Sequence, residues 1–115
     1  MDNSAGWAFY QQQLAYIRAK DVDGLIDNHY DDDAVLISFD HIVKGRADLA
    51  RYFRAYVDAL GDLAVESTDK FTATDDSILF EATMRSNLGR ARVYDAFVLR
   101  AGKISRHFSG VIETL

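Results

Sequence analysis

Two side chains near the end of the chain could exchange protons with a small molecule, Asp95 and His107. An imidazole titrates near neutral pH, and a neighbouring carboxylate can orient the ring and raise its basicity. Asp95 lies in a period-two row with Val93, Phe97 and Leu99, so an otherwise apolar strand face carries one acid. An acid on a buried face must be paired, protonated or functional. We therefore expect His107 to act as a base and Asp95 to orient it or to act as an acid.

The register of one hairpin decides whether these two side chains meet. Residues 90–112 read as two strands joined by a tight turn at Ala101 and Gly102, because glycine accepts a positive φ without steric cost. A three-residue turn would place Asp95 directly opposite His107. A two-residue turn would shift the register by one and pair Asp95 with Phe108 instead. A third interpretation makes Asp95 a structural acid that is bonded to a tyrosine or an amide.

Helical patterns precede strand patterns along the chain. Apolar residues recur at helical spacing in 7–20 and 46–60, and a short helix is expected from an N-cap at Asp21 to the acidic run 31–33, with His29 at its surface or end. Extended segments are expected at 34–39, 42–44, 63–74 and 77–86, before the hairpin. This order predicts an α+β fold in one domain, residues 1–115, with three N-terminal helices packed on a curved, mostly antiparallel sheet.

Composition excludes several functional classes. The net charge is -5 and the arginines are scattered, which argues against general binding of nucleic acid or of anionic membranes. Cysteine is absent, so the chain has no disulfide, thiolate zinc site or thiol nucleophile. The three histidines have no recognised metal spacing, and we expect neither a metal nor a cofactor. No signal-peptide pattern or membrane-length apolar run is present, so a cytoplasmic location is expected.

Four segments occur in the order and spacing of the nuclear transport factor 2-like superfamily, namely 20–26, 30–35, 44–53 and 94–104. In these segments the chain resembles SnoaL-like and ketosteroid isomerase-like domains. The resemblance covers nearly the whole chain and implies a cone-shaped α+β barrel with a pocket for an apolar small molecule. It also implies a homodimer that forms through the outer face of the sheet, where Tyr94, Ala96 and Val98 are expected. The fold hosts many functions, so the resemblance specifies no single reaction.

The resemblance to ketosteroid isomerases carries over only in part. It implies that Asp95 is the acid that donates to a developing oxyanion, and that Tyr30 is a tyrosine behind it. Gln13 stands where those enzymes have a tyrosine on the first helix, and Phe53 stands where they have another. Ser38 occupies the position of the general base, and serine cannot abstract a carbon-bound proton unaided. Ketosteroid isomerase activity is therefore not expected.

Polyketide cyclases offer a second comparison, because segment 103–109 is similar to one of their strands. This similarity implies that His107 occupies the position of the family's histidine. Ser109 replaces the aspartate that would act as acid or base there, which argues against cyclase chemistry by that route. Asp40, in the loop beside Ser38, could substitute for a missing carboxylate, although a solvated turn is the simpler interpretation.

These observations leave two hypotheses. The first is a cofactor-independent isomerase, cyclase or dehydratase that acts on an apolar cyclic or polyketide-like substrate, with Tyr16 or Gln13 binding a substrate oxygen. The second is a non-catalytic ligand-binding or dimerisation domain of the same fold, which the replaced acid-base positions favour. The predicted pocket is lined by Phe9, Tyr16, Ile17, Phe53, Phe80, Met84, Phe97 and Val111, with Gln13, Tyr30, Ser38 and Ser109 as further ligand-binding candidates.

Overall fold

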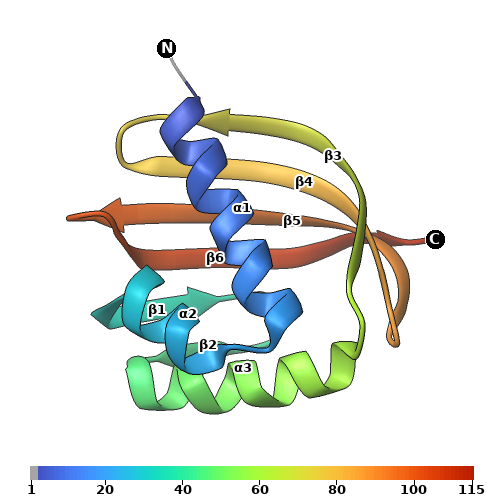
Figure 1. The fold of residues 1–115 in the computed structure, drawn as a ribbon, viewed down its shortest axis with the longest axis horizontal. Coiled ribbons are helices and arrows are strands. Elements are labelled where there is room, and N and C mark those ends of the chain that lie inside the picture. Colours follow the sequence, from blue (N-terminus) through green and yellow to red (C-terminus); the bar gives the residue numbers. More distant parts are fainter. Residues whose placement is uncertain (1–2) are drawn as a thin grey trace.

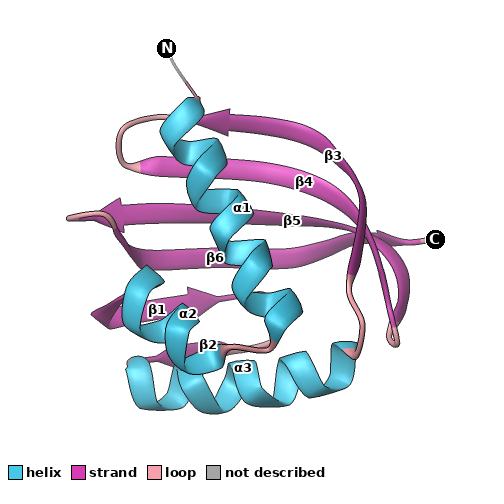
Figure 2. Ribbon diagram, in the orientation of Figure 1, coloured by secondary structure: helices cyan, strands magenta, loops and turns pink. Residues whose placement is uncertain are grey.

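The computed structural model describes residues 3–115, and these residues form three helices and six strands (Figure 1). The helices are α1 (Ser4–Ala19), α2 (Val22–His29) and α3 (Arg46–Leu60). The strands are β1 (Tyr30–Ile37), β2 (Ile42–Lys44), β3 (Ala64–Ala73), β4 (Ser77–Ser86), β5 (Gly89–Arg100) and β6 (Lys103–Thr114). Figure 2 shows the helices gathered over one face of the sheet, which confirms the predicted α+β class.

The strands form a single sheet in the order β2-β1-β6-β5-β4-β3. β1 runs parallel to β6 and all other neighbours are antiparallel, so the sheet is mostly antiparallel as predicted. The β3–β4 ladder shifts register twice, between Val65 and Ser67 and again between Thr68 and Lys70. Such irregularities bend a strand and increase its twist, and β3 curves strongly in Figure 2. The bend gives the sheet a concave face for the helices.

The acidic run at Asp31, Asp32 and Asp33 is where the predicted elements differ from the observed ones. The run was expected to close the second helix, but α2 ends at His29 and the three acids belong to β1. Two of the three charges are compensated, because Asp31 pairs with Arg100 and Asp32 pairs with Arg46. The three acids lie in an irregular stretch of β1, between its pairings of Tyr30 with Ile104 and of Val35 with Arg106.

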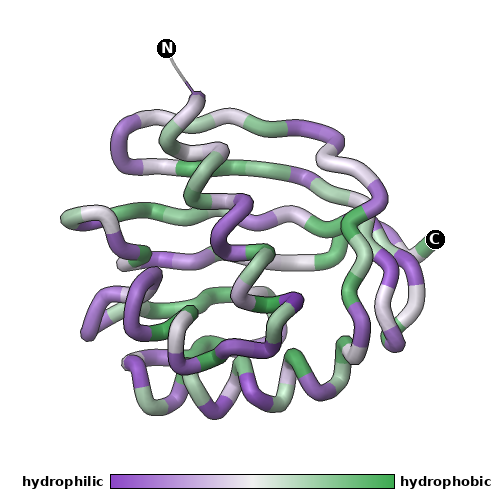
Figure 3. The backbone as a smooth tube through the Cα atoms, viewed as in Figure 1, coloured by the Kyte–Doolittle hydropathy of each residue, from purple (hydrophilic) through white to green (hydrophobic). Residues whose placement is uncertain are grey.

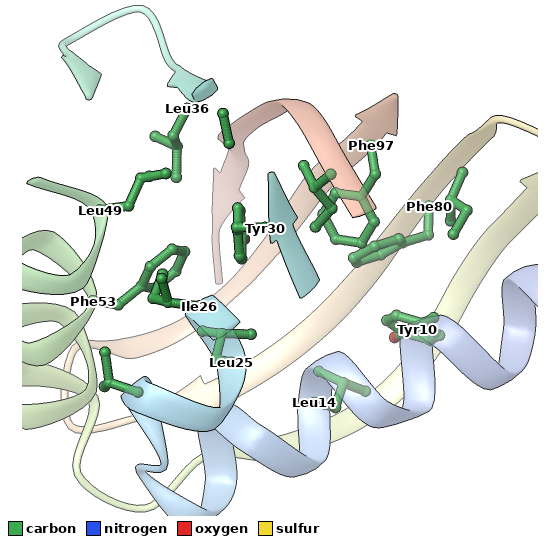
Figure 4. Packing of buried hydrophobic residues seen from close by; sticks show 14 of the residues in the cluster. Tyr10, Leu14, Leu25, Ile26, Tyr30, Leu36, Leu49, Phe53, Phe80 and Phe97 are labelled. Carbon is green, nitrogen blue, oxygen red and sulfur yellow. The ribbon is translucent and has the colours of Figure 1, made fainter. Parts of the chain in front are cut away.

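The core fills the space between the concave face and the helices, as Figure 4 shows for its labelled side chains. Its large members come from every layer: Tyr10, Leu14, Leu25, Ile26, Tyr30, Leu36, Leu49, Phe53, Phe80 and Phe97. Hydrophobic and hydrophilic residues alternate around α3 in Figure 3, as expected for a helix with one buried face. Within residues 3–115, no helix combines the length and hydropathy that a membrane crossing requires.

Candidate acid-base site

The β5–β6 hairpin sets the register that the sequence left open. Its turn has two residues, Ala101 at φ 52° and Gly102 at φ 79°, and Arg100 pairs with Lys103. Two positive φ values are the requirement of a type I′ turn. The register then shifts between Val98 and Leu99, because an extra residue lies in β6 at Ser105. The hairpin is therefore a two-residue turn followed by a bulge.

The bulge decides which face of the sheet His107 occupies. Neither predicted register is correct, because Asp95 pairs with Ser109 and Phe97 pairs with His107. The two-residue turn alone would have sent His107 to the face opposite Asp95. The extra residue at Ser105 restores the parity, so the two side chains become diagonal neighbours on one face. His107 Nε2 lies 2.6 Å from Asp95 Oδ1.

A chain of buried hydrogen bonds continues behind His107. The Tyr30 hydroxyl lies 2.8 Å from His107 Nδ1, and Gln13 Nε2 donates to that hydroxyl at 2.9 Å. His29 Nδ1 lies 2.7 Å from Gln13 Oε1. The expectation that His29 is a surface residue is wrong, because its side chain is buried and stacks on Phe9 with ring centroids 3.9 Å apart. Helix α2 buries Val22, Leu25, Ile26 and His29 at helical spacing, a signal that was present in the sequence.

Both ring nitrogens of His107 are engaged in this chain. Tyr30 receives the Gln13 amide proton, so its own hydroxyl proton is directed to His107 Nδ1. Neutral His107 then carries its proton on Nε2 and donates it to Asp95. His107 has no lone pair left for a substrate in this arrangement. The group that the pair presents to a ligand is therefore Asp95.

The surroundings of Asp95 favour its protonated form more than water does. Burial raises the pKa of Asp95, and the hydrogen bond from His107 opposes that rise. Burial, with a smaller contribution from the Asp95 charge, also raises the pKa values of Tyr52 and Tyr56. These phenols therefore remain hydrogen-bond donors at neutral pH. A carboxyl group with a raised pKa beside neutral donors is suited to proton exchange with a bound molecule.

Asp95 and His107 line a cavity of about 460 Å³, a size that suits a small organic ligand. Its wall combines residues of α1 and α3 with residues on the concave face of β4, β5 and β6. Among the residues expected to bind ligand, the lining contains Gln13, Ile17, Ser38, Asp40, Phe53, Phe80, Met84, Phe97, Ser109 and Val111.

Residues 10–107 match the SnoaL-like domain family. The chain belongs to this family. No curated protein shows significant sequence similarity to this SnoaL-like chain. Its fold is shared with a nuclear transport factor 2-like protein of unknown function from Burkholderia xenovorans, at 16% identity and a TM-score of 0.79 over 98% of this chain and 87% of that one. The predicted nuclear transport factor 2-like cone fold is thereby confirmed.

Two further solved structures share the fold and carry ascribed activities. A Sinorhizobium meliloti protein ascribed to the polyketide cyclases has 18% identity and a TM-score of 0.76, covering 90% of this chain and 94% of that one. A Kribbella flavida protein ascribed to the ketosteroid isomerases has 15% identity and a TM-score of 0.77, covering 94% and 78%. At these identities the likeness establishes the fold of the SnoaL-like chain and leaves its reaction to the site itself.

Three residues expected at the ligand lie outside the cavity wall. Phe9 packs on His29, away from the cavity. Tyr16 faces α2, where its hydroxyl accepts a hydrogen bond of 3.1 Å from the Asn28 side chain. Tyr30 is fully buried behind His107 and acts on the site through that ring. Tyr16 was expected to bind a substrate oxygen, but it does not line the cavity, and its hydroxyl is engaged with Asn28.

Helix α3 supplies two cavity tyrosines, Tyr52 and Tyr56, which the sequence pattern indicates only as members of an apolar stripe. Tyr52 and Tyr56 stack with ring centroids 6.0 Å apart and planes 10° apart, one helical turn from each other. Their spacing around Phe53 was the available signal. The remaining lining residues that were not predicted are Leu14, Leu36, Phe39, His41, Leu63, Val93, Tyr94 and Gly110.

Tyr94 was assigned to the outer sheet face, yet it also contributes to the cavity wall. Its cross-strand partner is Gly110, and a Cβ atom at Gly110 would lie 2.6 Å from the Tyr94 ring. The missing side chain at Gly110 therefore lets the tyrosine ring lie flat across β6 near the mouth of the cavity.

The loop between β1 and β2 forms the rim of the cavity. Ser38 closes it by donating its backbone N–H to the His41 carbonyl at 3.0 Å, while the His41 N–H donates to the Ser38 hydroxyl at 3.2 Å. Asp40 is exposed at the tip of this turn. Asp40 therefore lines the cavity from an exposed position, whereas Asp95 is half-buried. In the described residues 3–115, no group of acids and histidines is arranged to hold a metal ion.

Proposed function

We propose that this SnoaL-like chain is a cofactor-independent enzyme that moves a proton on an uncharged, apolar cyclic or polyketide-like molecule, as an isomerase, cyclase or dehydratase does. The observation that carries the proposal is the Asp95 carboxyl group, which lies on the wall of an apolar cavity with His107 Nε2 at 2.6 Å. Such chemistry is most efficient when the pKa of the catalytic group lies near the operating pH.

In the proposed mechanism Asp95 exchanges a proton with the substrate, and His107 holds the Asp95 carboxyl group in place. The ionised carboxylate would take a proton from a carbon next to a carbonyl group, and the protonated acid would return it elsewhere on the substrate. The raised pKa of Asp95 supports both half-steps, since burial makes the acid easier to protonate. The hydroxyls of Tyr52 and Tyr56 supply donors for a substrate oxygen. This assignment exchanges the roles first expected for Asp95 and His107.

The charge of the cavity supports an uncharged substrate. Its lining in the described part of the chain contains Asp40 and Asp95 and no lysine or arginine. A carboxylate or phosphate ligand would meet negative charge without a compensating cation. Phenylalanine and tyrosine rings supply much of the remaining surface, which favours a flat apolar ring system.

A non-catalytic ligand-binding domain is the second candidate. The observation that favours it is that Ser38 and Ser109, which stand where related enzymes have carboxylates, line the cavity and cannot act as a second acid. A single acid-base group can still relay one proton between two carbons of one substrate. We therefore favour the enzyme over the ligand-binding domain.

The two candidates differ in one measurable reaction, which is exchange of a carbon-bound proton with solvent. A fused bicyclic ketone is incubated with the protein in deuterated water, and deuterium uptake beside the carbonyl is followed by NMR. We expect the wild type to accelerate uptake and Asp95→Asn to lose about 100-fold or more of that acceleration. Asp40→Asn is the matched control and retains it. Saturable binding of the ketone without any deuterium uptake would reject the proposed enzyme activity and favour a ligand-binding function.

We also propose that the chain forms a homodimer through the outer face of the sheet. Leu79, Ala96 and Phe108 lie side by side across β4, β5 and β6 on that face, and Leu79 and Phe108 are 49% and 38% exposed. A mass measurement by light scattering tests this proposal. We expect a dimer for the wild type and a monomer for Phe108→Glu, and a monomeric wild type would reject the interface.

A further inference from the structure

The hydrogen-bond chain that ends at Asp95 begins at a second histidine, His29. Five side chains from α2, α1, β1, β6 and β5 are linked in the order His29, Gln13, Tyr30, His107 and Asp95, by contacts of 2.7, 2.9, 2.8 and 2.6 Å. Four of them are nearly inaccessible: Tyr30 0%, Gln13 3%, His29 3% and His107 5% exposed. Buried groups of this kind depend on one another for their hydrogen bonds.

The amide of Gln13 gives the chain a direction. Its carbonyl oxygen can only accept, so His29 must donate to it from Nδ1. Its NH₂ group can only donate, so the Tyr30 oxygen accepts and the Tyr30 proton passes to His107 Nδ1. His107 then donates from Nε2 to Asp95, and every donor in the chain points toward the carboxylate. This direction matches an ionised Asp95, which can only accept.

The opposite direction would require a different protonation state at Asp95. With the Gln13 amide turned over, Tyr30 would donate to Gln13, and His107 would have to donate from Nδ1 to Tyr30. His107 Nε2 would then present a lone pair, and Asp95 would need its own proton to meet it. The direction of the chain and the protonation of Asp95 are therefore linked.

We propose that His29 is a positioning residue for Asp95: its Nδ1–H, donated to the Gln13 carbonyl, sets the chain direction that leaves Asp95 ionised and able to accept a proton. This inference rests on the proposed function for its meaning in catalysis, but it concerns hydrogen-bond geometry that can be observed without a substrate.

Three features of His29 suit it to this role. Burial lowers its pKa from 6.5 to about 4, so the neutral ring has one proton to donate. Stacking on Phe9 and an edge contact with Tyr16 hold the plane of the ring. The proton has a nearer acceptor at Nδ1, the Gln13 oxygen at 2.7 Å, than at Nε2, where the Gln12 side-chain oxygen lies 3.4 Å away.

A pair of substitutions separates the donor of His29 from its ring. His29→Asn keeps an N–H donor close to the position of Nδ1 but lacks the ring, whereas His29→Phe keeps the ring and lacks the donor. Ring ¹⁵N shifts report the tautomer of His107, and the Asp95 carboxyl ¹³C shift reports its titration midpoint. We expect the Nε2–H tautomer of His107 in the wild type and in His29→Asn. In His29→Phe we expect a mixture of tautomers and an Asp95 midpoint about one pH unit higher, a tenfold change in proton affinity.

A third variant, Gln13→Glu, should move the proton of His107 to Nδ1. Gln13→Glu replaces the amide by a group that accepts from both His29 and Tyr30, so His107 Nδ1 must carry a proton to satisfy the Tyr30 oxygen. The ¹⁵N shift of Nδ1 should then move to its protonated value. This result shows whether the direction of the chain sets the His107 tautomer, even if His29→Phe does not fold.

Two outcomes would overturn the inference. The first is an unchanged His107 tautomer and Asp95 midpoint in His29→Phe, or, where that variant is unfolded, an unprotonated Nδ1 in Gln13→Glu. The second is a shift in His29→Asn as large as in His29→Phe, since the ring and not its donor would then matter. Failure of deuterium uptake with these NMR results intact would reject the proposed reaction and leave the role of His29 standing.

Discussion

The burial of His29 should make this protein sensitive to mild acid. The ring titrates at 6.5 in the unfolded chain, whereas in the folded chain burial lowers its pKa to about 4. Between these two values the unfolded chain binds the additional proton, so the free energy of unfolding falls as the pH falls through this window. A separation of about 2.5 pKa units at 1.36 kcal/mol each gives a loss of about 3 kcal/mol between neutral pH and pH 4.

The assay compares the wild type with His29→Asn by urea unfolding at a series of pH values. Other groups also titrate in this range, and Asp95 acts in the opposite direction because its raised pKa makes the folded chain bind protons more readily. Subtracting the two pH profiles cancels these common contributions. We expect the difference in unfolding free energy to narrow by about 3 kcal/mol as the pH falls from 7 to 4. Parallel profiles would refute the reasoning, because they would show that His29 titrates alike in both states.

Three further predictions concern the hydrogen-bond chain, the β5–β6 turn and the charge of the cavity. Tyr30→Phe removes a hydroxyl that bonds on two sides inside the core, and should lower the unfolding free energy by about 2 kcal/mol in urea titrations, while Tyr52→Phe, at the cavity, should change it little. Ala101→Asn should raise it by up to about 1 kcal/mol, because Ala101 has a positive φ beside Gly102 and asparagine tolerates that conformation better; a loss of stability would contradict the turn assignment. Calorimetric titration with 2-naphthol and 2-naphthoate should show the alcohol binding about tenfold or more tightly, and equal affinities would contradict the charge argument.

Most of the fold could be predicted from local sequence patterns. The apolar spacing of α1 and α3 and the alternation in β4 depend on residues close in sequence, and these elements lie where the pattern predicts them. The boundary of α2 was misplaced because the acids of segment 31–33 resemble a helix end, whereas their partners Arg46 and Arg100 are distant in sequence. Local chemistry cannot reveal a compensating charge that only the folded chain supplies.

The candidate site required information that the sequence pattern does not contain. The residue types of Asp95 and His107 identified them as partners, but their register depended on the bulge at Ser105, which has no strong sequence signal. The tight turn was predicted correctly, yet a turn fixes only the pairing nearest to it. The burial of His29 was predictable in principle, because it follows Leu25 and Ile26 at helical spacing. Its polar character led to an assignment at the surface.

The junction between α2 and β1 ties the helical layer mechanically to the acid. His29 is the last residue of the helix and Tyr30 is the first of the strand, so two consecutive residues hold two links of one hydrogen-bond chain. A small displacement of α2 would stretch both links at once and transmit the strain to Asp95 through His107. Occupancy of the cavity should therefore be felt outside it, as a change in the amide exchange rates of a helix that the ligand does not contact.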